Sequence, residues 1–193
     1  LARKVRQNKL DARVGAWSNE WSEGFKRGTL ATQLSGAWLA GHLNNWLAPG
    51  TRGLWRAAQL PEGAWAAYGG TFLAIARGAP AANKALAWEL IRLMTLDRRL
   101  QLEGFRSQGA FPALIAAQQA PFFGEPIPFL DGQKARIQWR EAAAAIPPFP
   151  VHKLDPIAAE IVDSALDEVL EGRSIDAALS DARHLVERRA ERG

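Results

Sequence analysis

The segment EGFKRGTLATQLSGAW, residues 23–38, contains the end of one helix, an extended stretch and the start of another helix. Gly28 ends the first helix, because glycine readily adopts the left-handed backbone conformation found at helix C-termini. Residues 29–34 are rich in Leu and Thr and predict a strand. A Ser-Gly pair then breaks the strand, and residues 37–47 predict a short helix. The segment therefore predicts alternating helix and strand.

The rest of the chain extends this order. Residues 54–60 predict a second strand, and residues 71–76 predict a third. Both faces of the third are apolar, which is typical of a strand buried on both sides. Apolar residues at helical spacing predict further helices over residues 81–95, 133–145 and 155–171, and from Ser174 onward. In the last two helices the predicted buried stripes include Leu166 and Leu179. We therefore predict a helix-rich α/β fold.

Composition excludes several classes of protein. Of the 193 residues, 48% are hydrophobic and 23% are charged, which is ordinary for a globular domain and unlike a disordered chain. No apolar run approaches the ~20 residues that span a bilayer, so we expect a soluble protein. The absence of cysteine rules out disulfides and cysteine-ligated metals and is compatible with an oxidising periplasm.

The charge pattern leaves a second class of function open. The net charge of +4 would suit an anionic partner, so the alternative is a basic helical interaction module that binds nucleic acid or a partner protein. In the C-terminal tail, however, basic residues alternate with acidic ones. Such a pattern favours solvated helix faces over a groove that follows phosphates.

No enzyme motif is present. Gly36 and Gly41 have the spacing of phosphate-loop glycines, but His42 stands where that loop requires lysine. The three histidines lie far apart in the sequence and lack metal-ligand spacing. Asp163 and Asp167 share a helix face without any hydrolase motif around them. We therefore predict no catalytic residue, no metal and no cofactor.

The order of the motifs resembles the family-1 extracellular solute-binding proteins of ABC sugar importers. In that family a helix ends at Phe-x-x-Gly, a strand and Gly-x-Trp follow, a second strand ends in Leu-Pro, and a Gly-Gly pair precedes a third strand and a helix. The matching segments here are 23–31, 35–38, 54–61, 69–75, 83–91, 109–112 and 171–179. Together they cover nearly the whole chain.

The resemblance implies a fold and a function. It implies part of a two-lobed periplasmic binding protein type II fold whose N-terminal half is missing. Residues 1–70 and 127–193 would belong to the C-terminal lobe, and residues 71–126 would be a returning segment of the N-terminal lobe. The implied function is capture of a small solute, a sugar or polyol, and its delivery to the permease subunits of an ABC transporter.

The resemblance also implies a compartment. Such receptors are periplasmic or extracellular, and a lipid anchor is compatible with this assignment. The chain begins Leu1-Ala2-Arg3 without a signal-peptide pattern, so we expect it to be a product of processing, truncation or domain excision.

The candidate ligand-binding residues centre on Trp38. It follows a strand and a Ser-Gly break at the start of a helix, and a tryptophan ring can stack on the C–H face of a sugar. The alternative role is packing of the helix onto the sheet. Gly69 and Gly70 could allow close backbone approach to a ligand or only an unusual backbone turn, and Tyr68 beside them could line the cleft.

Three polar residues complete the candidate site. Arg106 and Gln108 precede a Gly-x-x-Pro turn and could hydrogen-bond to sugar hydroxyls, the alternative being a solvated loop. His152 follows a proline-rich stretch and could line the cleft rim, although a lone histidine more often has a structural role. Tryptophans in helical patterns are predicted to lie in the core: Trp17, Trp21, Trp88 and Trp139.

Overall fold

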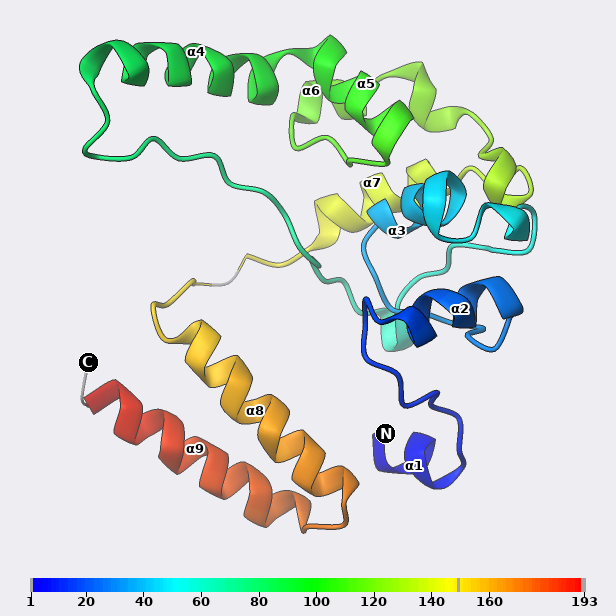
Figure 1. The fold of residues 1–193 in the computed structure, drawn as a ribbon, viewed down its shortest axis with the longest axis vertical. Helices are drawn as coiled ribbons and strands as arrows, with labels where there is room; N and C mark the ends of the chain where they lie inside the picture. The colour runs from blue at the N-terminus through cyan, green and yellow to red at the C-terminus, as the bar shows by residue number, and fades with distance from the viewer. Residues whose placement is uncertain (1, 149, 192–193) are drawn as a thin grey trace. The chain divides into compact units, whose positions relative to one another are not determined.

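The computed structural model describes residues 2–148 and 150–191, and these form helices joined by extended segments (Figure 1). The α-helices are α1 (Ala2–Gln7), α2 (Asn19–Arg27), α3 (Trp38–His42), α4 (Ala81–Leu96), α5 (Arg98–Gln108), α6 (Ile115–Gln118), α7 (Ala135–Ala145), α8 (Asp155–Leu170) and α9 (Ile175–Glu191). The π-helix η1 (Leu43–Leu47) continues α3 directly. Short 3-10 turns are η2 (Pro49–Thr51), η3 (Pro61–Gly63), η4 (Pro121–Gly124) and η5 (Pro128–Leu130). The helices predicted from the sequence are confirmed.

The chain divides into two compact units. One consists of the residues up to Arg13 together with those from Pro148, and the other runs from Val14 to Pro147. The lobe boundaries predicted at residues 70 and 126 concern a larger protein and stay a prediction.

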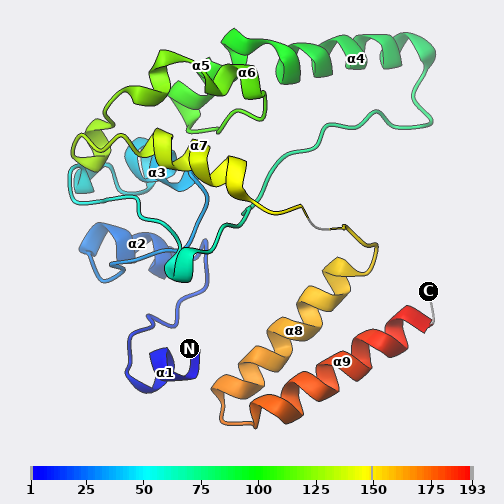
Figure 2. The ribbon, with the colours of Figure 1, turned by 180° about the vertical axis from the view of Figure 1, so that it is seen from behind.

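The smaller unit is a hairpin of α8 and α9, which lie side by side in both views (Figures 1 and 2). Small residues make its interior: Ala165, Val169, Ala178 and Ala182. The predicted stripe of larger residues is wrong in part, because Leu166 and Leu179 are exposed. Close approach of the two helices favours alanine at the contact, so the larger side chains lie outside it. The Arg3 guanidinium closes the hairpin, donating to the carbonyls of Val169 at 3.2 Å and Arg173 at 2.5 Å.

The larger unit has an aromatic and aliphatic core around α2. The Ser18 hydroxyl caps α2 by accepting the Trp21 N–H at 3.1 Å, and Gly28 ends the helix with a φ of 71°, as predicted. The core consists of Trp21, Phe25, Leu39, Leu43, Leu47, Ala48, Phe129, Leu130 and Ala135. It therefore joins α2, α3 and η1 to a segment almost 100 residues further along the chain.

A second cluster packs between α5 and α7. Phe105, Ala120, Phe122 and Phe123 are buried there, and Phe111 and Trp139 pack against them. Phe105 makes edge-to-face contacts with Phe111 and Phe122, at centroid distances of 5.4 and 5.6 Å. Trp139 contacts both clusters and so links them, which confirms its predicted place in the core.

The predicted strands are not formed. Segments 29–34, 54–60 and 71–76 are extended, but in the described part of the chain they take part in no β-ladder. A strand needs a ladder of backbone hydrogen bonds to a neighbouring segment, and within the described residues these three segments form none. At one point a side chain substitutes for a strand: the Gln133 amide donates to the Ala57 carbonyl at 2.7 Å and accepts its N–H at 2.8 Å.

The third extended segment also contradicts the prediction of burial on both faces. Phe72 is 98% exposed, and only Ile75 among residues 71–76 is partly covered. Within residues 2–148 and 150–191, no helix is long and apolar enough to cross a lipid bilayer. The α/β prediction is thus confirmed for its helices and not for its sheet.

Candidate aromatic binding site

Trp38 is positioned by a glycine on its N-terminal side. The indole N–H donates to the Tyr68 carbonyl at 3.3 Å, which ties the start of α3 to the extended segment after η3. A Cβ on Gly36 would lie 2.6 Å from the indole nitrogen and 3.1 Å from the Tyr68 oxygen. Gly36 is therefore required for this contact, and the Ser-Gly break identified in the sequence places the tryptophan.

Three aromatic rings lie in a row around this hydrogen bond. The Trp38 ring stacks on Trp17 at a centroid distance of 5.7 Å and an interplanar angle of 18°. It stacks on Tyr68 at 5.9 Å and 24°. Near-parallel, offset rings at these distances attract each other and present flat apolar faces.

Two further rings extend the row along the helix. His42 and Trp46 follow Trp38 at intervals of four residues, and so share its face of α3 and η1. The His42 ring lies 5.1 Å from the Trp38 ring and 5.3 Å from the Trp46 ring, centroid to centroid. In the described structure its buried Nδ1 has no hydrogen-bond partner, and the Trp17 ring lies 6.1 Å from the His42 ring, centroid to centroid. We refer to Trp17, Trp38, His42, Trp46 and Tyr68 as the aromatic platform.

The platform is open to solvent at its outer rings. Trp17 and Trp46 are each 56% exposed and Tyr68 is 60% exposed, whereas Trp38 is half-buried and packs against the core. The packing role considered from the sequence is therefore confirmed for Trp38, and its role as a stacking surface for a ligand stays a prediction. Trp38 holds α3 onto the core, and it supports the exposed rings on either side.

Gly69 and Gly70 continue the chain directly beside the platform. Their φ angles are 83° and 142°, which L-residues with side chains rarely adopt. A Cβ on Gly69 would lie 3.8 Å from the Trp38 indole nitrogen, in ordinary contact distance. The pair thus lets the backbone turn away from Tyr68 without covering the rings.

Gln108 lies at the end of α5, against the platform helix. A Cβ on Gly41 in α3 would be 2.8 Å from the Gln108 carbonyl oxygen and 3.1 Å from the Gly109 Cα. The Asn45 amide also donates to the Ser107 carbonyl at 2.9 Å. The two backbones meet here without intervening side chains, which brings the exposed Gln108 to the neighbourhood of the platform helix.

Arg106 belongs to the second aromatic cluster. Its guanidinium lies 4.0 Å from the Phe122 ring centroid and 3.7 Å from the Glu125 carboxylate. Arg136 lies 3.8 Å from the same ring, and burial, together with repulsion from Arg106, lowers the pKa of Arg136. These contacts hold the Arg106 side chain against the second aromatic cluster.

His152 lies in the other compact unit. Its backbone N–H donates to the Asp155 carboxylate at 2.8 Å, and its Nδ1 accepts the Leu154 N–H at 3.2 Å. These bonds form a turn before α8. The structure therefore brings together Trp38, Tyr68, Gly69 and Gly70, places Gln108 against the same helix, and engages Arg106 and His152 elsewhere.

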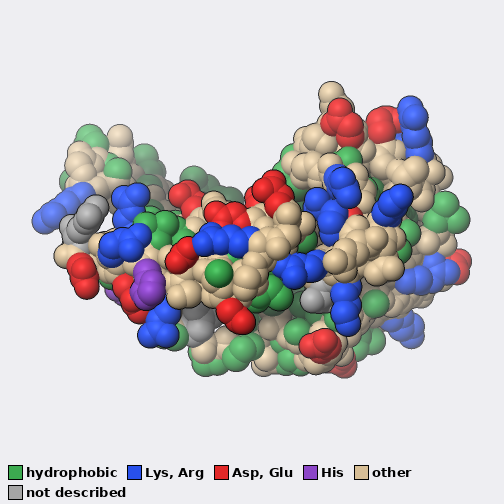
Figure 3. All heavy atoms as spheres, turned by 90° about the horizontal axis from the view of Figure 1, so that it is seen from below, with side chains coloured by type: hydrophobic (Ala, Val, Ile, Leu, Met, Phe, Trp, Pro, Cys, Tyr) green, Lys and Arg blue, Asp and Glu red, His purple; other side chains and the backbone are tan. Residues whose placement is uncertain are grey.

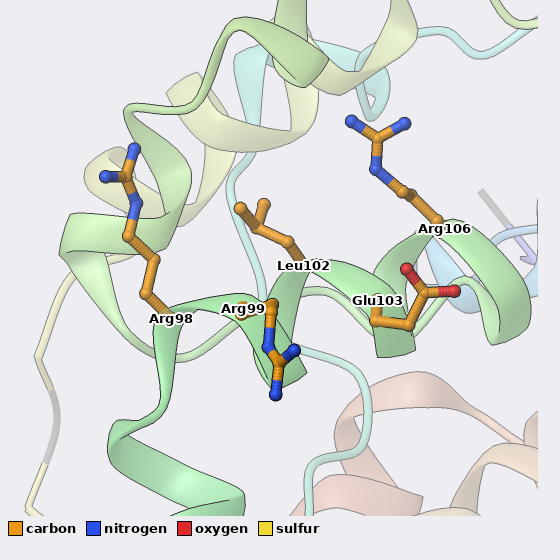
Figure 4. Close-up of a pocket in the computed structure, with 5 residues that line it drawn as sticks. All are labelled: Arg98, Arg99, Leu102, Glu103 and Arg106. Atoms are coloured by element: carbon orange, nitrogen blue, oxygen red, sulfur yellow. The ribbon is translucent and has the colours of Figure 1, made fainter.

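A hollow of about 400 Å³ beside α5 is lined by Arg98, Arg99, Leu102, Glu103 and Arg106. Its side chains fan out from the helix and do not converge on one point (Figure 4). In the described residues, no group of three or more His, Cys, Asp or Glu side chains could hold a metal ion.

Sequence reasoning missed three members of the platform. Trp17 was assigned to a helix face, but it precedes the Ser18 cap and has a left-handed φ of 69°, which turns its ring onto Trp38. His42 and Trp46 were not considered as ligand-binding residues. The available signal was their position four and eight residues after Trp38, which places all three on one helix face.

No protein-family model and no curated protein matches the chain. Among solved structures, it is similar to the ABC transporter associated binding protein from B. animalis subsp. lactis Bl-04 in complex with beta-1,6-galactobiose. The TM-score is 0.72 at 23% sequence identity, covering 95% of this chain and 48% of that chain. The likeness shows that the chain shares the fold of part of that protein. The chain spans about half the length of that protein.

Proposed function

We propose that this chain is part of a non-enzymatic substrate-binding component of an ABC importer, and that it captures a neutral sugar or polyol on the aromatic platform. The observation that carries the proposal is the row of Trp17, Trp38 and Tyr68. Flat rings with exposed faces suit the C–H faces of a sugar, and the Tyr68–Gly70 backbone beside them offers groups for its hydroxyls.

The similar solved structure supports this proposal. That protein is associated with an ABC transporter and was solved in complex with a disaccharide. Delivery of the solute to permease subunits and an extracellular or periplasmic location belong to the same proposal, since both follow from this class of protein.

The basic interaction module is supported less well. Several arginines and lysines of this chain pair with nearby carboxylates, as Arg173, between α8 and α9, does with Glu168 and Asp181. On the face shown in Figure 3, blue and red side chains are interleaved and do not segregate. A nucleic-acid surface instead presents a continuous basic stripe. Steeply salt-dependent binding to nucleic acid would favour this alternative.

Calorimetric titration tests the proposal. We expect binding to one or more neutral saccharides or polyols, among them galactobiose, galactose and glycerol. Tyr68→Ala should weaken it by about tenfold, or ~1.4 kcal/mol, because it removes one stacking ring. The unfolding temperature should not change, since Tyr68 is largely exposed.

Trp88→Ala is the matched control, since Trp88 is an exposed aromatic residue on α4 outside the platform. It should leave the affinity unchanged. Absence of heat with every sugar, polyol and glycerol phosphate would refute the proposal.

A further inference from the structure

Trp17 stacks on Trp38 from a strained backbone position. Its φ is 69°, in the left-handed region that bulky L-residues rarely adopt. The ring nevertheless contacts Trp38 at a centroid distance of 5.7 Å and Trp21 at 5.0 Å, and 56% of the residue stays exposed. A left-handed residue costs free energy of the same order as one aromatic pair contributes, so the backbone offsets much of what these contacts add. The stacked position of Trp17 is therefore only weakly favoured.

The segment that carries Trp17 is held by little backbone hydrogen bonding. Within the described residues, the backbone of residues 12–17 makes one hydrogen bond, in which the Gly15 carbonyl accepts the Ser18 N–H at 3.2 Å. A Cβ on Gly15 would meet nothing within 4 Å, so the turn has space around it. The cap of α2 is Ser18, which lies after Trp17. Movement of the Trp17 ring therefore requires a change in its own turn and leaves α2 folded.

The His42 ring beside Trp17 has a polar atom without a partner. Its buried Nδ1 makes no hydrogen bond in the described structure, which is costly and rare in folded proteins. Three indole rings lie around the imidazole, at centroid distances of 6.1 Å for Trp17, 5.1 Å for Trp38 and 5.3 Å for Trp46. Trp38 and Trp46 belong to the same helical run as the imidazole, whereas Trp17 comes from the turn before α2. Of these three rings, Trp17 is the one that can move away without disrupting that helical run.

Tyr68, the other ring stacked on Trp38, is held more firmly. The Trp38 indole N–H donates to the Tyr68 carbonyl at 3.3 Å. A Cβ on Gly36 would lie 3.1 Å from the same oxygen, so the backbones are closely packed at this contact. Tyr68 therefore stays beside Trp38 when Trp17 leaves.

We propose that Trp17 covers a sugar subsite in the ligand-free chain, and that a neutral saccharide takes its place, with one face on Trp38 and a hydroxyl donating to His42 Nδ1. A neutral imidazole accepts at Nδ1 when its proton is on Nε2. The inference rests on the proposed function, because it places the ligand on the same aromatic platform. It gives Trp17 an effect opposite to that of Tyr68: Trp17 competes with the sugar, and the apparent affinity falls with the fraction of molecules that are covered.

Calorimetric titration with galactobiose compares the chain with two glycine variants. Trp17→Gly removes the covering ring and the left-handed strain together, and it should raise the affinity by at least about threefold, because the subsite no longer has to be uncovered. Arg13→Gly is the matched control, since Arg13 has a φ of 54° in the same connection between α1 and α2 and contributes no ring to the platform. It should leave the affinity unchanged.

Substitution of His42 tests the hydrogen bond to the sugar. His42→Phe keeps an aromatic ring and removes Nδ1, so galactobiose binding should weaken by about tenfold as one hydroxyl loses its acceptor. The unfolding temperature should not fall, because Nδ1 has no hydrogen bond to lose in the described structure. An unchanged affinity would show that His42 only packs between the indoles.

Proton NMR follows the covering ring directly. Nuclear Overhauser contacts between the Trp17 and Trp38 indole protons should be present in the free chain, where the rings stack. They should be absent when galactobiose saturates the chain. This measurement needs no substitution at Trp17 and so does not depend on the folding of the glycine variant.

Two results would overturn the inference and leave the proposed function in place. One is galactobiose binding that is equally tight or weaker in Trp17→Gly, and the other is a Trp17–Trp38 contact that persists at saturation. Absence of galactobiose binding to both the chain and Trp17→Gly would overturn it as well. The wider panel of saccharides and polyols then decides the proposed function separately.

Discussion

Helix α2 and helix α4 both carry large apolar residues at helical spacing, yet only α2 buries them. Trp21 and Phe25 of α2 lie in the core, whereas Leu86 and Leu90 of α4 remain exposed. The pattern in α2 is satisfied by residues of the same chain, from α3 to η5. An apolar pattern at helical spacing therefore predicts that a helix has a face to be covered. It does not show which polypeptide covers that face.

The largest expected difference in stability is between alanine substitutions in α2 and in α4. Phe25→Ala should destabilise the larger unit by about 3–5 kcal/mol, because it removes a fully buried ring and leaves a cavity. Leu90→Ala should change stability by less than about 0.5 kcal/mol, since the side chain is exposed and alanine favours helix. Urea unfolding of both variants measures the difference. Equal losses would show that α4 is packed as tightly as α2.

The contact between α3 and α5 gives the next largest effect. Gly41→Ala should cost about 1–3 kcal/mol, because the new Cβ would meet the Gln108 carbonyl oxygen at 2.8 Å and backbone cannot easily move aside. Gly104→Ala in α5 should instead stabilise by about 0.5–1 kcal/mol, as nothing lies within 4 Å of its Cβ. The unfolding temperature should therefore fall for Gly41→Ala and rise for Gly104→Ala. A change in the same direction for both variants would contradict the close approach of the α3 and α5 backbones.

The Gln133 side chain holds the extended residues 54–60 in place through two hydrogen bonds to the Ala57 backbone, and its substitution tests this role. Gln133→Ala should cost about 1–2 kcal/mol, because it leaves the Ala57 N–H and carbonyl without their two hydrogen bonds. Gln59→Ala, in the same extended segment but on an exposed residue, is the control and should have little effect. Chemical denaturation measures the unfolding free energy of the two variants. Equal values would show that the Gln133 amide does not hold residues 54–60 in place.

The smallest effect concerns the surface of α2. A hydrogen bond and the charge of Lys26 lower the pKa of the exposed Glu23, with a further contribution from Arg27. Because the folded state lowers this pKa, the carboxylate adds stability above its ordinary pKa of 4.5, and the contribution is lost as the pH falls below that value. Glu23→Gln should slightly lower the melting temperature at neutral pH and not at about pH 2. A difference that persists in acid would refute the pairing.

The sequence predicted the helices because their signals are local. Gly28 at the end of α2 and the leucine spacing of α4 act within a few residues of where they stand. The prediction of strands failed because pairing depends on a second segment, and the apolar composition of residues 71–76 does not show whether that segment is present. The prediction of buried leucines in the α8–α9 hairpin was wrong for a related reason. The distance between the two helices decides whether leucine or alanine fits at their contact, and this distance cannot be read from either helix alone.

The binding site was predictable in part. Trp38, Tyr68 and the two glycines were selected individually, but the hydrogen bond between Trp38 and a carbonyl 30 residues away follows only from the folded chain. Trp17 was missed because its backbone leaves the helical path that its spacing suggests. Arg106 and His152 were selected by residue type alone, and their contacts with Phe122 and Glu125 and with the Leu154 N–H depend on the folded chain.

The central claim is that the aromatic platform binds a sugar, and the indole N–H signals of the chain test it most directly. Two-dimensional nitrogen–proton NMR, with each tryptophan assigned by substitution, is recorded during titration with a saccharide that binds in calorimetry. We predict shifts of the Trp17, Trp38 and Trp46 signals and an unchanged Trp88 signal, because only the first three belong to the platform. Saturable binding that leaves these three signals in place would contradict the account.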